Sequence, residues 1–150
     1  MSRIRDQIKF HEGVKNEVYK DHLGYLTVGV GHLILETDPE NDLEVGETIS
    51  DERVNELFEI DLKGCTNELD AKLPWWKDCD DVRQRCLIDL VFNMGMPRLL
   101  KFKKTLELFE NGDYENAGIE LLDSNYARQV PNRANRISEM IKTGIDSQDF

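Results

Sequence analysis

Only one stretch of this chain, residues 14–35, has the composition of β-strands. Val18 and Tyr19 precede a turn-rich Lys-Asp-His-Leu-Gly stretch, and Tyr-Leu-Thr-Val-Gly-Val-Gly-His-Leu follows it. β-Branched and aromatic residues between Asp and Gly turns are typical of a hairpin or a small antiparallel meander. The rest of the 150 residues has helical periodicity, so the sheet is a minor part of the predicted fold.

Apolar residues at helical spacing predict a short helix over residues 3–12, which Gly13 ends. Ser50 is a good N-cap for a long helix over residues 51–72, and Leu73-Pro74 ends that helix. Shorter helices are expected over 82–94, 105–111, 115–122 and 132–142. This outline is an α+β fold, mainly α, in which the long helix joins a small antiparallel sheet lobe to a helical bundle lobe.

The length of 150 residues fits one domain, residues 1–150. Within it we expect a sheet-containing N-terminal lobe over 13–58 and a helical C-terminal lobe over 1–12 plus 59–150. No apolar stretch is long enough to span a bilayer, and the N-terminus has no apolar signal-peptide core. These observations predict that the protein accumulates in the cytoplasm of the producing cell and does not insert into the membrane.

The net charge of −11 is concentrated in one segment. Residues 36–61 hold eleven acids and one base, Arg53, and residues 36–47 are expected to form an exposed acidic loop. The charge disfavours nucleic acid as a partner, because binding to phosphates needs clustered Lys and Arg. The alternating acids from Asp38 resemble a calcium loop, but Leu43 and Ile49 stand where such a loop needs Gly and Glu.

Neither a metal nor a cofactor is therefore expected. The three cysteines form no Cys-x-x-Cys pair, and we interpret them as reduced thiols. Trp75 and Trp76 follow Pro74 in an interhelix loop, so packing is favoured over a sugar-binding role.

Hydrolysis of a glycosidic bond needs an acid for the leaving oxygen and a carboxylate that activates water or attacks carbon. Glu12 lies where the first helix meets the predicted sheet, and partial burial there favours its protonated form. Asp21 follows in the hairpin turn, and the Thr27 hydroxyl on the next strand is suited to hold a water. With thirty acids in the chain, this pair alone is a weak signal.

The segment from Phe10 to His32 resembles the active-site segment of the T-even type bacteriophage lysozymes, glycoside hydrolase family twenty-four. That family carries Glu-Gly, Tyr-x-Asp and Gly-x-x-Thr-x-Gly-x-Gly-His at the same spacing. Phe-Asn-Met-Gly at 92–95, Asn-Gly-Asp-Tyr at 111–114 and Pro-Asn-Arg-Ala-x-Arg at 131–136 resemble its later motifs. The resemblance implies a lysozyme-like fold.

The resemblance also implies roles for individual residues. Glu12 would be the general acid, and Asp21 and Thr27 would position or activate the attacking water. His32 would pair with Asp61 on the long helix, and Arg133 would lie near Glu12. Substrate-binding candidates are Gly31, Leu33, Phe92, Asn93 and Phe102; for Phe92 and Asn93, core packing and a satisfied helix-end amide are equally good interpretations.

The function implied is hydrolysis, with inversion, of the β-1,4 bond between N-acetylmuramic acid and N-acetylglucosamine in bacterial peptidoglycan. Its purpose would be phage lysis of the host cell or wall penetration. A lytic transglycosylase would need the acid but not the Asp21–Thr27 pair, and a third alternative is a non-catalytic wall-binding or virion structural module. We expect a monomer that acts on glycan strands and that, if it is not virion-borne, depends on a separate pore-forming protein to reach the wall.

Two features fit this function poorly. Bacterial walls are polyanionic and repel an acidic enzyme, so we predict a dipolar molecule, with an acidic N-terminal lobe and long helix set against a basic C-terminal lobe. Asp89 lies on a predicted core helix, where an acid is costly unless it is paired or exposed. The solvent side of the helix is one interpretation, and Arg85 offers one partner.

Overall fold

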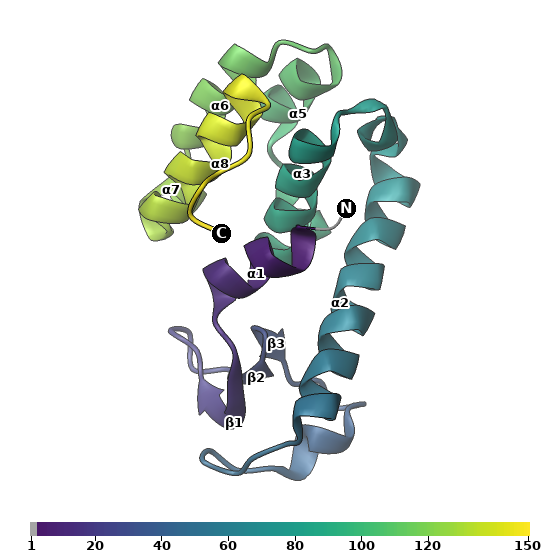
Figure 1. Cartoon of the computed structure of the whole chain (residues 1–150), viewed down its shortest axis with the longest axis vertical. Coiled ribbons are helices and arrows are strands. Elements are labelled where there is room, and N and C mark those ends of the chain that lie inside the picture. The colour runs from purple at the N-terminus through teal and green to yellow at the C-terminus, as the bar shows by residue number, and fades with distance from the viewer. Residues whose placement is uncertain (1–2) are drawn as a thin grey trace. The chain divides into compact units, whose positions relative to one another are not determined.

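The longest helix of the protein begins and ends where its sequence predicts. In the computed structural model, which describes residues 3–150, α2 spans Asp51–Lys72. The N–H of Arg53 donates to Oγ of Ser50 at 3.1 Å, so Ser50 caps this helix as predicted. The α+β, mainly α fold is confirmed (Figure 1). The other elements are α1 (Ile4–Glu12), β1 (Lys15–Lys20), β2 (Leu26–Gly29), β3 (His32–Leu33), η1 (Pro39–Asp42), η2 (Pro74–Asp78), α3 (Asp81–Met94), α4 (Met96–Leu99), α5 (Lys103–Glu110), α6 (Tyr114–Leu122), α7 (Asn125–Gln129) and α8 (Pro131–Thr143).

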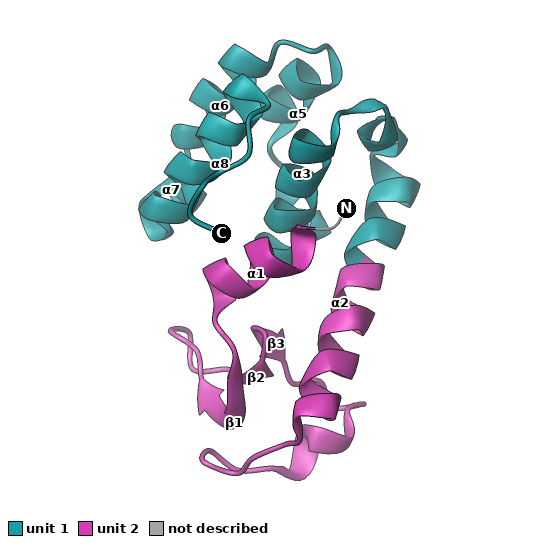
Figure 2. Ribbon diagram, in the orientation of Figure 1, with its two compact units in different colours: residues 1–2, 65–150 teal, residues 3–64 magenta. Residues whose placement is uncertain are grey.

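The chain divides into two compact units (Figure 2). Residues 3–64 contain the sheet, and the described part of the other unit is residues 65–150. Helix α2 runs through the boundary between them. The expected lobes, 13–58 and 1–12 plus 59–150, stay a prediction.

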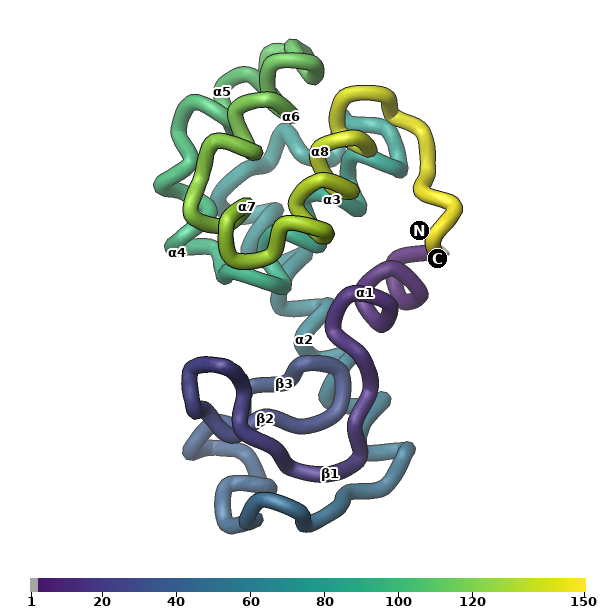
Figure 3. The backbone as a smooth tube through the Cα atoms, turned by 90° about the vertical axis from the view of Figure 1, so that its left-hand side faces the viewer, coloured from purple at the N-terminus to yellow at the C-terminus, as the bar shows by residue number. Residues whose placement is uncertain are grey.

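In the unit of residues 3–64, three antiparallel strands form a sheet in the order β1-β2-β3 (Figure 3). One face of this sheet is apolar: Val18 and Val28 are buried and cluster with Leu57 of α2. Leu26 and Ile34 pack against the same cluster. Because side chains alternate along a strand, the residues between them lie on the opposite face, and this face carries the candidate site.

In the unit of residues 65–150, α6 packs against α5 and α8, and α8 also packs against α3. Asp89 of α3 lies inside this unit with no exposed surface, so the expectation of a solvent-facing Asp89 is wrong. Nε of Arg133 lies 2.8 Å from Oδ1 of Asp89, which offsets the cost of burying the carboxylate. Arg85, the partner that its spacing offers, pairs with Asp81 and Asp146.

The expected packing of the tryptophan pair is confirmed for Trp76, which is buried and donates from Nε1 to Asp70 at 2.8 Å. The ring of Trp75 lies 5.7 Å from that of Phe109. Of the cysteines, Cys65 and Cys86 are buried and Cys79 is half-buried, and residues 3–150 contain no disulfide. Within the same range, no helix is both long and apolar enough to cross a membrane.

The prediction of an exposed acidic loop over residues 36–47 is only partly right. It contains the short helix η1, and Glu40 within it is buried. Burial of this carboxylate is compensated by an ion pair with Arg53 on α2. The acidic segment therefore contributes to the folded unit of residues 3–64.

Candidate active site

The candidate catalytic residues on the sheet share one face because of the hairpin register. Tyr19 of β1 stands opposite Thr27 of β2. The pairing continues into the turn, where the N–H of Asp21 donates to the carbonyl of Tyr25 at 2.9 Å. Tyr19 and Asp21 are two residues apart on one strand, as Tyr25 and Thr27 are on the other, so all four lie on the face away from the apolar cluster. Leu33 of β3 pairs with Thr27 and extends this row.

Asp21 is held by the backbone of its own turn. Its Oδ1 accepts the N–H groups of Leu23 and Tyr25, each at 2.9 Å. These two bonds fix the direction of the Asp21 carboxyl group. Oδ2 makes no hydrogen bond with any other residue of the described chain, so this oxygen is available to a water or a substrate.

Glu12 is the last residue of α1, and Gly13 ends the helix with a φ of 75°. The Glu12 side chain lies directly against Gly31 in the β2–β3 turn. A Cβ on Gly31 would be 2.6 Å from Oε1 and 3.0 Å from Cδ of Glu12, and Gly31 has a φ of +59°. Only glycine allows the carboxyl group to approach the backbone this closely.

The phenol of Tyr19 interacts electrostatically with both candidate carboxylates. Burial raises the pKa of Tyr19, and the negative charges of Glu12 and Asp21 raise it further. Coulomb interactions of this kind need proximity. Both charges thus act on one phenol: Asp21 from the same sheet face, and Glu12 from its place against Gly31.

Thr27 is buried, with 4% of its surface exposed. Its hydroxyl donates to the carbonyl of Tyr25 at 3.0 Å. Because the hydroxyl hydrogen is used in this bond, the remaining lone pairs of Oγ1 can only accept. The Thr27 oxygen is thus suited to receive a hydrogen from a water.

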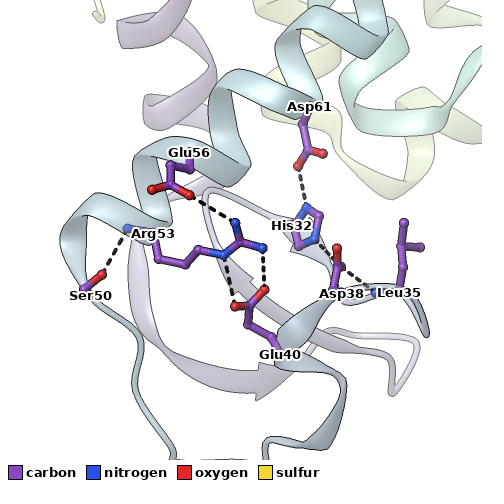
Figure 4. A network of polar contacts seen from close by, with 8 residues as sticks. All are labelled: His32, Leu35, Asp38, Glu40, Ser50, Arg53, Glu56 and Asp61. Atoms are coloured by element: carbon purple, nitrogen blue, oxygen red, sulfur yellow. Dashed lines mark hydrogen bonds and ion pairs between the residues drawn. The ribbon is translucent and has the colours of Figure 1, made fainter.

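His32 lies next to Gly31 and is bonded on both ring nitrogens (Figure 4). Nδ1 is 2.6 Å from Oδ2 of Asp61, the pairing that the resemblance implied, and Nε2 is 2.8 Å from Oδ2 of Asp38. Hydrogen bonds to two carboxylates use an N–H donor on each ring nitrogen, an arrangement that favours the imidazolium form. The role of His32 and Asp61 in supporting catalysis stays a prediction.

The electrostatics of this trio agree with its geometry. Burial acts to lower the pKa of His32, but the hydrogen bonds of Asp61 and Asp38 outweigh it, and the pKa is raised. Burial acts to raise the pKa of Asp38, whereas the Leu35 N–H and the His32 ring lower it below its ordinary value. No local sequence pattern indicates Asp38, since its partner, His32, lies on β3.

Arg53 forms the second charged contact of this region (Figure 4). Its Nε and Nη2 donate to the two carboxylate oxygens of Glu40 at 3.0 and 2.9 Å, and Nη1 donates to Glu56 at 3.2 Å. These bonds lower the pKa of Glu40. In residues 3–150, no three His, Cys, Asp or Glu side chains are placed to hold a metal ion.

The structure gathers seven of the predicted site residues in the unit of residues 3–64: Glu12, Asp21, Thr27, Gly31, His32, Leu33 and Asp61. The other four belong to the unit of residues 65–150: Phe92 and Asn93 near the end of α3, Phe102 at the start of α5, and Arg133 in α8. The approach of Arg133 to Glu12 stays a prediction, and so do the substrate-binding roles. The sequence interpretation missed Tyr19, Tyr25 and Asp38 as site residues, although strand alternation from Asp21 and Thr27 indicates the two tyrosines.

This geometry accompanies similarity to known proteins over nearly the whole chain. The chain is 34% identical to the probable T4-type lysozyme 1 of Dictyostelium discoideum and 33% identical to lysozyme 2 of that organism, with 96% of each chain covered. It is 30% identical to the pre-baseplate central spike protein Gp5 of Enterobacteria phage T4, over 94% of this chain and 28% of that protein. The phage lysozyme family model matches residues 9–137. The chain therefore belongs to the phage lysozyme family and is an enzyme of that family.

Proposed function

We propose that the protein hydrolyses the β-1,4 bond between N-acetylmuramic acid and N-acetylglucosamine in bacterial peptidoglycan. The observation that carries this proposal is the placement of Glu12 against Gly31 of the β2–β3 turn, and of Asp21 and Thr27 on one face of the same sheet. Glycoside hydrolysis needs two carboxylates in different roles. The lysozyme names of the two Dictyostelium relatives support the same substrate class.

The resemblance of the Glu-Gly and Tyr-x-Asp motifs to those of the phage lysozymes supports a division of labour between the two carboxylates. Glu12, in its acid form, donates its proton to the glycosidic oxygen as the bond to the anomeric carbon breaks. Oδ2 of Asp21 accepts one proton of the attacking water, and Oγ1 of Thr27 accepts a hydrogen bond from the same water. The water oxygen becomes the new hydroxyl on the opposite face of the sugar, so the reaction inverts the configuration.

Gly31 and His32 serve this chemistry by placing Glu12. The carboxyl group of Glu12 lies against Gly31, and the next residue, His32, is fixed by Asp61 and Asp38. A proton donor works only within hydrogen-bond reach of the leaving oxygen. The charged trio is therefore a support for the general acid.

The physiological setting that we propose is lysis of a bacterial host or penetration of its wall. As a free monomer made in the cytoplasm, the protein would need a separate pore-forming protein to reach the wall. The similarity to a phage T4 central spike protein favours a virion-borne form as the second candidate. Detection of this chain in purified phage virions would support the virion-borne form.

Product analysis tests the activity. Purified protein is incubated with peptidoglycan, and reducing-end muropeptides are expected, whereas anhydro ends would mean a transglycosylase and no soluble product would mean a binding module. Glu12→Gln is expected to lower the rate about 100-fold or more. Glu17→Gln is the matched control, since Glu17 is an exposed residue of β1. Equal activity in wild type and Glu12→Gln would overturn the assignment of the acid.

A further inference from the structure

The face that carries Asp21 and Thr27 also carries an aromatic side chain that the fold leaves open. Tyr25 has 58% of its surface exposed. Among residues 3–150 its ring has no aromatic or cationic neighbour, whereas Tyr19 on the same face is half-buried with Nζ of Lys15 4.4 Å from its ring centroid. The two tyrosines thus differ: one packs within the protein, and the other presents its ring to solvent.

The backbone of Tyr25 is fixed by both candidate catalytic residues. Its carbonyl accepts from the N–H of Asp21 at 2.9 Å and from the hydroxyl of Thr27 at 3.0 Å. Its N–H donates to Oδ1 of Asp21 at 2.9 Å. The position of the Tyr25 Cα relative to the Asp21 carboxylate and the Thr27 hydroxyl is therefore rigid, although the side chain itself is exposed.

Folding does not explain an exposed aromatic at this place. The hairpin register is set by the apolar face, through Val18 and Val28, and the turn by the bonds to Asp21. A large apolar surface beside polar catalytic groups is a feature of ligand sites. The C–H faces of pyranose rings are apolar and flat, and an aromatic ring covers them well.

We propose that Tyr25 is an additional sugar-binding residue, whose ring stacks on the pyranose unit next to Asp21. This inference rests on the proposed function and specifies its substrate contact. Leu33, 46% exposed and opposite Thr27 on β3, offers a second apolar surface on the same face. The glycan strand thus covers Tyr25, Thr27 and Leu33, with its scissile bond at Thr27.

The ring, and not the hydroxyl, carries this contact. Tyr25→Phe keeps the ring, and Tyr25→Ala removes it, while the backbone bonds to Asp21 and Thr27 need no side chain. Ile60→Ala is the matched control, since Ile60 is 60% exposed on the α2 surface and belongs to no part of the site.

Binding of soluble, uncrosslinked peptidoglycan fragments is measured in a Glu12→Gln background, so that no fragment is cleaved. Tyr25→Ala is expected to raise the Kd about three- to ten-fold, and Tyr25→Phe and Ile60→Ala to leave it within about two-fold. In the active background, the same change should appear in KM with kcat nearly unchanged.

An unchanged Kd in Tyr25→Ala, with thermal unfolding like that of the parent, would overturn the proposal. A loss in Tyr25→Phe as large as in Tyr25→Ala would also overturn it, because the hydroxyl would then be the contact. Failure of the proposed function gives a different result: the wild type would release no muropeptides, whereas the Kd comparison would still report on Tyr25.

Discussion

Two sets of carboxylates in the unit of residues 3–64 have opposite surroundings. On the sheet face, Asp21 is bonded to backbone N–H groups and the Glu12 side chain lies against a glycine. In the acidic segment, Asp38 and Glu40 bind the charged side chains of His32 and Arg53. The first set leaves a carboxylate oxygen for chemistry, and the second uses its charges to hold the fold.

This difference explains why the concentration of acids is compatible with a folded unit. Asp38, Glu40, Glu56 and Asp61 each contact a cation of the same unit. A buried carboxylate is tolerated when it is paired and hydrogen-bonded. The net charge of the segment therefore overstates the repulsion within it.

The largest effect on activity is expected when Gly31, which lies against the Glu12 carboxyl group, is replaced. Gly31→Ala places a Cβ 2.6 Å from Oε1 of Glu12, so the carboxyl group must move. A displacement of about 1 Å in a catalytic group can lower a rate about 100-fold. The variant is assayed on peptidoglycan and by thermal unfolding.

Gly112→Ala separates crowding from backbone strain. Gly112 also has a positive φ, +78°, but a Cβ there meets nothing within 4 Å. This control should lose stability but not activity. Comparable activity losses in both variants would mean that strain, and not contact with Glu12, causes the effect.

The next largest effect concerns the His32 trio. Asp61→Asn removes one charged partner of a buried imidazolium, and we expect a loss of about 2–3 kcal/mol in unfolding free energy near pH 5.5. The loss should be smaller near pH 9. Urea unfolding at the two pH values checks this, with Asp38→Asn expected to behave in the same way.

The direction of this pH dependence follows from linkage. The folded-state pKa of His32 is raised, so its stabilisation is complete below the unfolded value of about 6.5 and is lost as pH rises through the folded value. The pKa of Asp38 is lowered, so its stabilisation is present above about 3.9 and is lost as pH falls. The contribution of the trio is therefore greatest between about pH 4 and 6.5, and a loss in Asp61→Asn that grows at alkaline pH would contradict it.

A smaller effect is expected at Arg53. Arg53→Met breaks the two bonds to Glu40, whose side chain is 7% exposed, and should cost about 2 kcal/mol of unfolding free energy. Arg5→Met is the control, because the Arg5–Glu59 pair between α1 and α2 is half-exposed on both sides and should be worth less than about 1 kcal/mol. Equal losses in the two variants would show that burial does not distinguish these ion pairs.

The sequence was most informative where signals are local. Ser50 and Pro74 predict the start and the end of α2 correctly, because capping and proline geometry act on adjacent residues. The short helices η2, α4 and α7 were missed: each has four or five residues, too few for an apolar period. Two of them have a proline in their first turn: Pro74 in η2, which the sequence predicts only as the end of the preceding helix, and Pro97 in α4.

Contacts between side chains that are far apart in the chain are what the sequence predicts least well. Asp89 and Arg133 are 44 residues apart, so nothing beside Asp89 in the sequence indicated its partner. Its burial had a signal, since Val82, Cys86 and Asp89 follow one helical stripe. At the candidate site, motif spacing identifies Glu12, Asp21 and Thr27, and strand alternation from the last two indicates Tyr25. Asp38 is recognised only through its contact with His32.

The smallest effect concerns the approach to the wall. The expected basic C-terminal lobe is wrong as a description of its charge: residues 1–12 and 59–150 hold sixteen Lys and Arg against nineteen Asp and Glu. Positive charge is local instead. Arg98, Lys101, Lys103 and Lys104 line a cavity of about 470 Å³ with Phe102, where they outnumber the acids Glu120 and Asp123.

For an acidic protein on a polyanionic wall, repulsion should slow lysis at about 10 mM salt, where the Debye length is about 30 Å. The lysis rate should rise about two- to three-fold by 0.1 M, as net repulsion is screened, and fall again towards 1 M, where the attraction of the basic cavity is screened as well. Lys101→Gln combined with Lys103→Gln should lower the rate at the optimum, and Lys77→Gln, an exposed lysine outside the cavity, should change it less. A turbidity assay that shows the same rate at every salt concentration would mean that binding at the sheet face, and not charge, limits access to the glycan.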